Sequence, residues 1–184
     1  EMRMPDPLTE LVTGLNATRP NPAIRLPQWR PNETCRPLIE QPEDTLIAMC
    51  AFGEARSEGQ LGMMLVLMVA RNRIPLTRQR HWYGNAPTWQ AVLLHPFAFS
   101  CFGNEDANFR QMYDPNGEHG QQDETPAWEL ACAAAFDIYT DRCRDVTDGA
   151  THYHERSIEP SWVRSPRMVR TITLGQHIFF REEA

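Results

Sequence analysis

The sequence predicts an α+β fold in which helices come first along the chain and a small antiparallel sheet comes last, near the C-terminus. Two observations predict it: apolar residues recur at helical spacing over residues 45–73, and residues 168–180 alternate in hydropathy on either side of Gly175. A length of 184 residues suits one domain, or one domain with an arm. No apolar run approaches the roughly 18 residues that span a bilayer, so we expect no membrane span.

The composition excludes several classes of function. All 18 basic residues are Arg, and 24 acidic residues give a net charge of −6. An acidic chain is not expected to bind nucleic acid through a basic face, and a chain without Lys cannot form a Schiff base. The five cysteines are odd in number and include no C-x-x-C pair, which argues against a disulfide scaffold. We expect a monomer that uses no cofactor.

The first 42 residues are expected to form a Pro-rich arm. They hold eight of the 15 prolines. Proline lacks the backbone donor and restricts the residue before it, so long helices are excluded here, and only one short helical turn is expected over residues 6–15. We therefore divide the chain into an extended arm, residues 1–42, and a folded domain, residues 43–184.

Two long helices are expected at the start of the domain. Asp44 or Thr45 can cap a helix that runs from Thr45 to about Arg56 and has a broad apolar face. A second helix is expected over residues 58–73. It is apolar nearly all round, which is typical of a helix at the centre of a domain.

The rest of the domain is expected to change from helix to strand. Thr88 caps a short third helix, and residues 95–124 show no strong period, as is usual for a functional loop. A fourth helix is expected from Thr125 to about Asp141, with a proline at its first position. A short strand over residues 150–154 and a hairpin over residues 168–180 then form the sheet.

Glu54 is the first candidate for chemistry. It lies at the C-terminal end of the first helix, within Phe-Gly-Glu-Ala-Arg. The negative pole of the helix dipole and partial desolvation would both raise the pKa of a carboxyl there. A carboxylic acid that is still protonated near neutral pH can protonate a leaving oxygen. The alternative is a surface carboxylate paired with Arg56 or Arg71.

His152 and His154 flank Tyr153 on the expected strand, where residues i and i+2 share a face. That spacing would suit two metal ligands, with a third ligand from His119, Asp148 or Glu155. The alternative is that the two imidazoles contact substrate or form surface hydrogen bonds. No H-E-x-x-H pattern is present, and we expect no metal site.

Neither Cys101 nor Ser100 is expected to act as a nucleophile. Phenylalanines flank Cys101, which suits a buried inert thiol, and Ser100 lacks the G-x-S-x-G elbow. Aromatic residues in Gly-, Pro- or His-rich stretches more often face a cleft, where they can stack on sugar rings. Tyr83, Tyr153 and Trp162 are such residues.

Several ordered motifs between about residues 44 and 181 resemble those of the SleB/CwlJ-type cell-wall hydrolases, the family of the spore cortex-lytic enzymes. The first of them resembles that family's GEARGEG signature. The segments that carry the resemblance are AFGEARSEG at 51–59, MVARNRI at 68–74, FAFSCF at 97–102, DVTDGATHYH at 145–154, PSW at 160–162 and ITLGQHIF at 172–179.

The resemblance implies a lysozyme-like catalytic domain over residues 43–184. It implies cleavage of peptidoglycan glycan strands between N-acetylmuramic acid (MurNAc) and N-acetylglucosamine (GlcNAc) by a lytic transglycosylase that forms 1,6-anhydro-MurNAc. Glu54, the first Glu of the signature, would be the catalytic acid. The place of action would be the periplasm or the cell wall, and a phage lysis enzyme would also fit. The expected substrate-binding residues are Phe99, Ser100, Tyr153 and His154.

Other functions remain open at this point. A hydrolysing muramidase would use the same acid. A zinc-dependent N-acetylmuramoyl-L-alanine amidase would use His152, His154 and an acidic ligand instead. A non-catalytic wall-binding module that has kept the fold is the third possibility.

Overall fold

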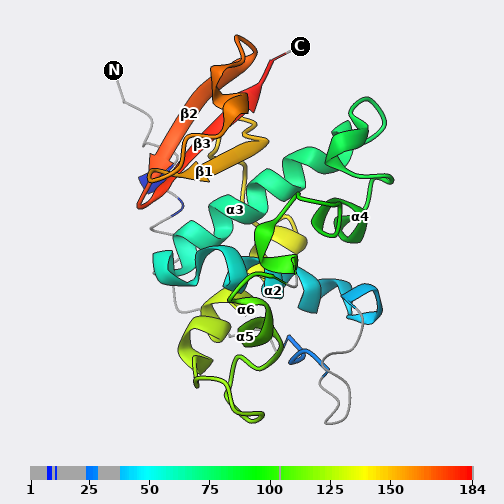
Figure 1. Cartoon of the computed structure of the whole chain (residues 1–184), viewed down its shortest axis with the longest axis vertical. Coiled ribbons are helices and arrows are strands. Elements are labelled where there is room, and N and C mark those ends of the chain that lie inside the picture. Colours follow the sequence, from blue (N-terminus) through cyan, green and yellow to red (C-terminus); the bar gives the residue numbers. More distant parts are fainter. Residues whose placement is uncertain (1–7, 10, 12–23, 29–37, 104, 184) are drawn as a thin grey trace.

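The computed structural model describes residues 8–9, 11, 24–28, 38–103 and 105–183 (Figure 1). Within them, α-helices and short 3-10 helices precede a three-stranded antiparallel sheet at the C-terminal end, which confirms the α+β prediction. The 3-10 helices are η1 (Leu38–Glu40), η2 (Arg56–Glu58), η3 (Ile74–Leu76), η4 (His81–Tyr83), η5 (Ser100–Phe102) and η6 (Ser161–Arg164).

Three long helices form the core. They are α2 (Glu43–Ala55), α3 (Gly59–Arg73) and α6 (Thr125–Tyr139), and each packs against the other two. Figure 1 shows α3 between the sheet on one side and α2 and α6 on the other. This position explains why residues 62–70 of α3 are all buried and why their sequence is apolar on every face.

Two shorter helices complete the helical part. Thr88 caps α4 (Trp89–Leu93), because its Oγ1 accepts a hydrogen bond from the backbone N–H of Ala91 at 3.2 Å. The helix α5 (Phe109–Tyr113) falls within the stretch that was expected to be a loop. Five residues are too few to show a helical period, so α5 could not be found by periodicity.

The sheet has the strand order β1-β3-β2, with β1 (His152–Glu155), β2 (Met168–Leu174) and β3 (His177–Glu182). The expected hairpin is present and consists of β2 and β3. The strand β3 is the central strand of the sheet, and β1 pairs with its other edge. Tyr153 lies opposite Phe179. Because side chains alternate along a strand, Tyr153 and Glu155 share one face of the sheet, while the two flanking histidines share the other.

The described parts of residues 1–42 contact the domain. Leu11, Ile24 and Leu38 pack against the core, and Thr45 Oγ1 donates a hydrogen bond to the carbonyl of Arg25 at 3.1 Å. Of the helical turn expected over residues 6–15, residues 8, 9 and 11 are helical and the others lie outside the described residues. The division of the chain at residue 42 stays a prediction.

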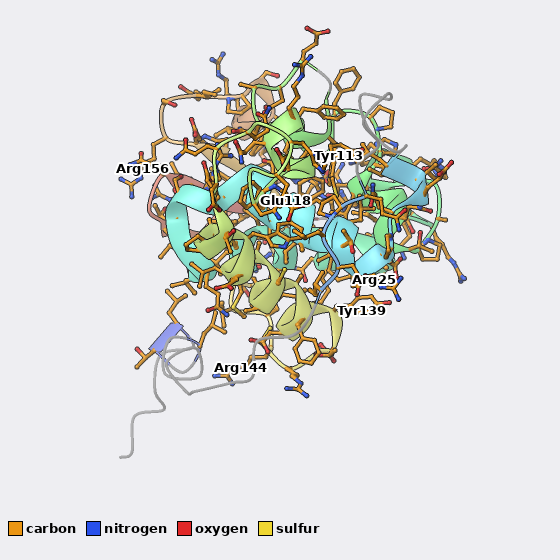
Figure 2. All side chains as sticks on the ribbon, turned by 90° about the horizontal axis from the view of Figure 1, so that it is seen from below. Arg25, Tyr113, Glu118, Tyr139, Arg144 and Arg156 are labelled. Carbon is orange, nitrogen blue, oxygen red and sulfur yellow. The ribbon has the colours of Figure 1, made fainter. Side chains whose placement is uncertain are left out.

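Three of the arginines lie apart from one another in the view of Figure 2. Arg25, Arg144 and Arg156 lie at separate edges of the molecule (Figure 2). Within the described part of the chain, no helix has both the length and the apolar character that crossing a bilayer requires.

Candidate active site

Glu54 lies in the last turn of α2, where the helix ends. The backbone leaves helical geometry at Ala55, forms the short turn of η2, and restarts as α3 at Gly59, whose φ of 68° favours glycine. The side chain of Glu54 is half-buried at this break.

Gly53 allows two other segments to approach the end of α2. A Cβ at this position would lie 2.4 Å from Met112 Sδ and 2.6 Å from Cys101 Cβ, so any larger residue would push α5 and η5 away. The close packing places the backbone N–H of Cys101 on the carboxylate of Glu54, the residue that follows Gly53. The glycine is therefore required for the geometry of the site.

Three donors hold the carboxylate of Glu54. Its Oε1 accepts hydrogen bonds from Cys101 N at 2.8 Å and from Ser100 Oγ at 3.2 Å. Its Oε2 accepts one from the hydroxyl of Tyr153 at 2.5 Å. A carboxylate has about four acceptor positions, two on each oxygen, so the one left open is on Oε2. A proton carried by Glu54 therefore belongs on Oε2.

The alternative reading of Glu54 as a surface ion pair does not hold. Arg56 pairs with Glu124 at 2.9 Å, and Arg71 pairs with Asp141 at 3.2 Å. Both arginines that could have paired with Glu54 thus have other carboxylate partners, which leaves Glu54 to its hydrogen-bond donors.

A cavity of about 430 Å³ opens beside this carboxyl group. Glu54, Ser100 and Tyr153 all line it, although they come from α2, η5 and β1. A concave site of this size with a few converging polar groups is typical of a ligand pocket. Three of the five site residues expected from the sequence therefore meet at one cavity.

Phe99 does not line this cavity. Its side chain is buried and packs against the ring of Tyr153, with the centroids 6.4 Å apart. It supports the residue that donates to Glu54 and is not itself presented to a ligand.

His154 is also kept away from the cavity. It points to the other face of the sheet, where its ring stacks on Phe180 at 5.4 Å and meets Trp162 edge-on at 5.6 Å. The expectation that His154 and Tyr153 line one groove conflicts with the alternation of side chains along β1. The structure thus does not bring His154 to Glu54.

Tyr153 is held so that it remains a donor. Its ring packs against His177 and Phe179, with centroids 5.2 and 5.7 Å away. Burial raises the pKa of Tyr153 well above its ordinary value, and the nearby charge of Glu54 raises it further. Its hydroxyl therefore stays protonated at neutral pH and continues to donate to Glu54.

Arg73 connects the two segments that supply these donors. Its Nε donates to the carbonyl of Thr151 at 2.7 Å, and its guanidinium also donates to the carbonyl of Ala98 at 3.4 Å. Thr151 lies two residues before Tyr153, and Ala98 lies two residues before Ser100. Arg73 is buried, and this burial lowers its pKa. The sequence analysis did not single out Arg73, although a charge at the end of an apolar helix was a usable signal.

Comparison with known proteins decides the family. The family model described as "Cell Wall Hydrolase" matches residues 57–180, about two thirds of the chain. The chain belongs to the cell wall hydrolase family. The match begins three residues after Glu54, so it does not include that residue. No curated protein sequence matches this cell wall hydrolase significantly.

Two solved structures have the same fold as this cell wall hydrolase. One is the catalytic domain of the SleB protein of Bacillus cereus, with 22% identity and a TM-score of 0.52, covering 76% of this chain and 89% of that one. The other is the catalytic domain of the germination-specific lytic transglycosylase SleB from Bacillus anthracis, with 21% identity, a TM-score of 0.52, and coverage of 76% and 93%. The fold is thus that of the SleB catalytic domains. The family match, and not the fold, identifies the protein as a cell wall hydrolase.

The geometry of a zinc site is not found in the described part of this cell wall hydrolase. Within residues 8–9, 11, 24–28, 38–103 and 105–183, no three His, Cys, Asp or Glu side chains are grouped so that they could hold a metal ion. His152 packs against the rings of Tyr83 and Trp162, and its Nδ1 lies 3.0 Å from Thr151 Oγ1. His152 thus has a packing role in the structure.

The burial of His152 predicts a loss of stability in acid. Burial, and then the charge of Arg73, lower its pKa from 6.5 to about 4 in the folded protein. Between these two pH values the unfolded chain binds a proton that the folded chain does not. The stabilisation is therefore complete above pH 6.5 and is lost as the pH falls toward 4, by about 3 kcal/mol in total. We expect urea unfolding to show that the stability of His152→Gln falls less between pH 7 and pH 4.5 than the stability of the wild-type protein. An equal fall in both proteins would contradict this assignment.

Two apolar side chains at the cavity of this cell wall hydrolase were not predicted as site residues. Phe97 is fully exposed and has a φ of 63°, which is strained for a bulky residue. Ile158, on the loop after β1, is 58% exposed. Both line the cavity. Ile158 could not be recognised in the sequence because it is a lone apolar residue in a loop. Phe97 stands among other apolar residues at 97–102, so the sequence did not show that its side chain is exposed.

Three polar residues of the cavity were also missed as site residues. They are Asp106, Asn108 and His177. The first two lie in the stretch without a period, where no spacing rule applies. His177 begins β3, far from Glu54 in sequence, and only the packing of the sheet on α3 brings it to the cavity.

Proposed function

We propose that this cell wall hydrolase cleaves the bond between MurNAc and GlcNAc as a lytic transglycosylase, with Glu54 as its acid and base. The observation that carries the proposal is the carboxyl group of Glu54, which three donors hold at a cavity that both polar and apolar side chains line. A transglycosylase needs one such carboxyl group. We assign the activity to residues 43–184 and its place of action to the cell wall.

The first step is protonation of the leaving oxygen. The proton on Oε2 of Glu54 passes to the glycosidic oxygen, and the bond from that oxygen to C1 of MurNAc breaks. The donors from Ser100, Cys101 and Tyr153 then hold the carboxylate that is formed. The 2-acetamido group of the sugar supports the cation at C1, so no enzyme nucleophile is required.

The second step closes the sugar on itself. The C6 hydroxyl of MurNAc attacks C1, and Oε2 of Glu54 takes up the hydroxyl proton. The product is 1,6-anhydro-MurNAc, no water is consumed, and Glu54 returns to its protonated form. The same carboxyl group therefore completes the cycle.

The cavity lining supports a sugar ligand. Phe97 offers an exposed ring, and Ile158 offers a second apolar surface at the same cavity. Pyranose rings present apolar C–H faces, and an aromatic ring packs well against such a face. Asp106, Asn108 and Ser100 supply hydrogen-bonding groups for hydroxyls. This combination suits a glycan strand better than a peptide.

Analysis of the products tests the proposal. Mass spectrometry of digested peptidoglycan should find 1,6-anhydro-MurNAc at the new glycan ends. Reducing MurNAc ends would assign the protein as a hydrolysing muramidase. Intact glycan with released stem peptides would assign it as an amidase.

A further inference from the structure

Glu58 and His177 form a buried pair, of which His177 lines the cavity beside Glu54. Glu58 lies in η2, and its side chain is only 7% exposed. Its Oε2 is 3.6 Å from Nδ1 of His177, and neither atom has a hydrogen-bond partner within the described residues. A buried carboxylate is costly unless it is paired. We therefore infer that Oε2 of Glu58 and Nδ1 of His177 are each other's partners.

The chain fixes Glu58 in this position from three sides. The backbone N–H of Gln176 donates to its Oε1 at 2.7 Å. A Cβ at Gly175 would lie 2.4 Å from its Oε2, and a Cβ at Gly62 would lie 2.4 Å from its Cβ. Both glycines thus leave the space that this carboxylate fills, and the pair joins the hairpin β2–β3 to the start of α3.

The imidazole of His177 has one edge left for the cavity. With Nδ1 turned to Glu58, Nε2 is the nitrogen that remains, and His177 lines the cavity together with Glu54. The ring meets Tyr153 at 87° with the centroids 5.2 Å apart, and the hydroxyl of Tyr153 donates to Glu54. The imidazole of His177 therefore lies against Tyr153, whose hydroxyl donates a hydrogen bond to Glu54.

We propose that Glu58 holds the proton of His177 on Nδ1, so that an unprotonated Nε2 accepts a hydrogen bond from the acetamido N–H of MurNAc. This inference rests on the proposed function. A carboxylate behind an imidazole fixes its tautomer through the hydrogen bond that it accepts. The gap of 3.6 Å is longer than a formed hydrogen bond, and catalytic hydrogen bonds often tighten only when substrate binds.

The hydrogen bond would strengthen during the reaction. As the acetamido oxygen shares the positive charge at C1, its N–H becomes a stronger donor. An acceptor aimed at that N–H then binds the transition state more tightly than the ground state, which raises kcat. In this scheme His177 is a catalytic residue, and Glu58 is a positioning residue.

Glu58→Gln tests the pair with little change in volume. The Gln oxygen can still accept from Gln176, but its amide group donates to Nδ1 and moves the His177 proton to Nε2. We expect kcat on glycan strands to fall by roughly 10²-fold, the size of losing one transition-state hydrogen bond, with KM nearly unchanged. An unchanged kcat would overturn the proposal. The matched control is Glu159→Gln, an exposed carboxylate paired with Arg164, which should behave as wild type.

Nitrogen-15 NMR of the histidines tests directly which ring nitrogen of His177 carries the proton. The wild-type protein should carry the neutral His177 proton on Nδ1, and Glu58→Gln should carry it on Nε2. A wild-type His177 with its proton on Nε2 would overturn the proposal, and this measurement does not require the variant to fold.

Substrate chemistry separates this inference from the proposed function. Glycan strands that have been chemically N-deacetylated offer no acetamido N–H, so wild type and Glu58→Gln should cleave them at the same low rate. A further loss of roughly 10²-fold on these strands would refute the acetamido contact. Failure of the proposed function would instead appear as full activity in Glu54→Gln, whatever Glu58→Gln does.

Discussion

Glu54→Gln should lose at least about 10²- to 10⁴-fold of the peptidoglycan-cleaving activity, the contribution of one positioned acid and base. The amide cannot give up a proton to the glycosidic oxygen or take one from the C6 hydroxyl. Release of soluble glycan from purified cell walls measures the rate. A variant that lyses walls at the wild-type rate would remove Glu54 from the mechanism.

The variant should remain folded, because its hydrogen bonds survive in altered form. The remaining oxygen can still accept from Cys101 N and Ser100 Oγ, and the hydroxyl of Tyr153 can rotate to accept from the new amide group. We therefore expect urea unfolding close to that of wild type. Glu159→Gln, an exposed carboxylate, serves as the control and should keep full activity. A large loss of stability in Glu54→Gln would mean that the activity data report unfolding.

The long helices could be predicted because their apolar patterns extend over several turns. The expected helices at 45–56 and 58–73 correspond to α2 and α3. The break between them determines the chemistry, because it ends α2 beside Glu54 and turns Glu58 toward β3. A continuous helix would have placed both carboxylates on one face. The local conformation at residues 55–59 depends on tertiary packing, which periodicity does not report.

The site itself could be predicted only in part. Ser100 and Tyr153 lie 46 and 99 residues from Glu54, and no spacing rule spans such distances. The resemblance to a family pointed to Glu54 as the acid, and Ser100 and Tyr153 were candidates for lining the groove. His154 was a candidate beside them, although strand alternation argues against a shared face with Tyr153. Physical reasoning on the strand alone could have separated these two neighbours.

Arg73→Lys should lose both stability and activity. Arg73 presents a planar fork that reaches the carbonyls of Thr151 and Ala98 at once, whereas the ammonium group of Lys is a single point that can serve only one of them. A hydrogen bond from a charged group contributes about 1.5–3 kcal/mol, so the loss of one of the two should lower the free energy of unfolding by roughly that amount, as measured by urea unfolding.

The activity of Arg73→Lys should fall more than its stability requires. When one carbonyl is released, the segment that carries Ser100 or the segment that carries Tyr153 can shift relative to Glu54. A misplacement of about 1 Å at a reacting group can lower the rate roughly 10²-fold. We therefore expect kcat, measured well below the unfolding temperature, to fall by roughly 10- to 100-fold. A normal kcat in a destabilised variant would limit Arg73 to a role in stability.

Arg71→Lys is the matched control, because Arg71 lies on the same helix and also bridges two groups. It pairs with Asp141, which is 88% exposed, and donates to the carbonyl of Cys143 at 2.9 Å. An ion pair with so exposed a partner is worth about 1 kcal/mol or less. Neither Asp141 nor Cys143 lies in a segment that supplies a hydrogen-bond donor to Glu54, so kcat of Arg71→Lys should not change. A similar loss of kcat in both variants would mean that α3 responds to any Arg substitution, whereas a loss in Arg73→Lys alone would assign the effect to the fork that joins residues 98 and 151.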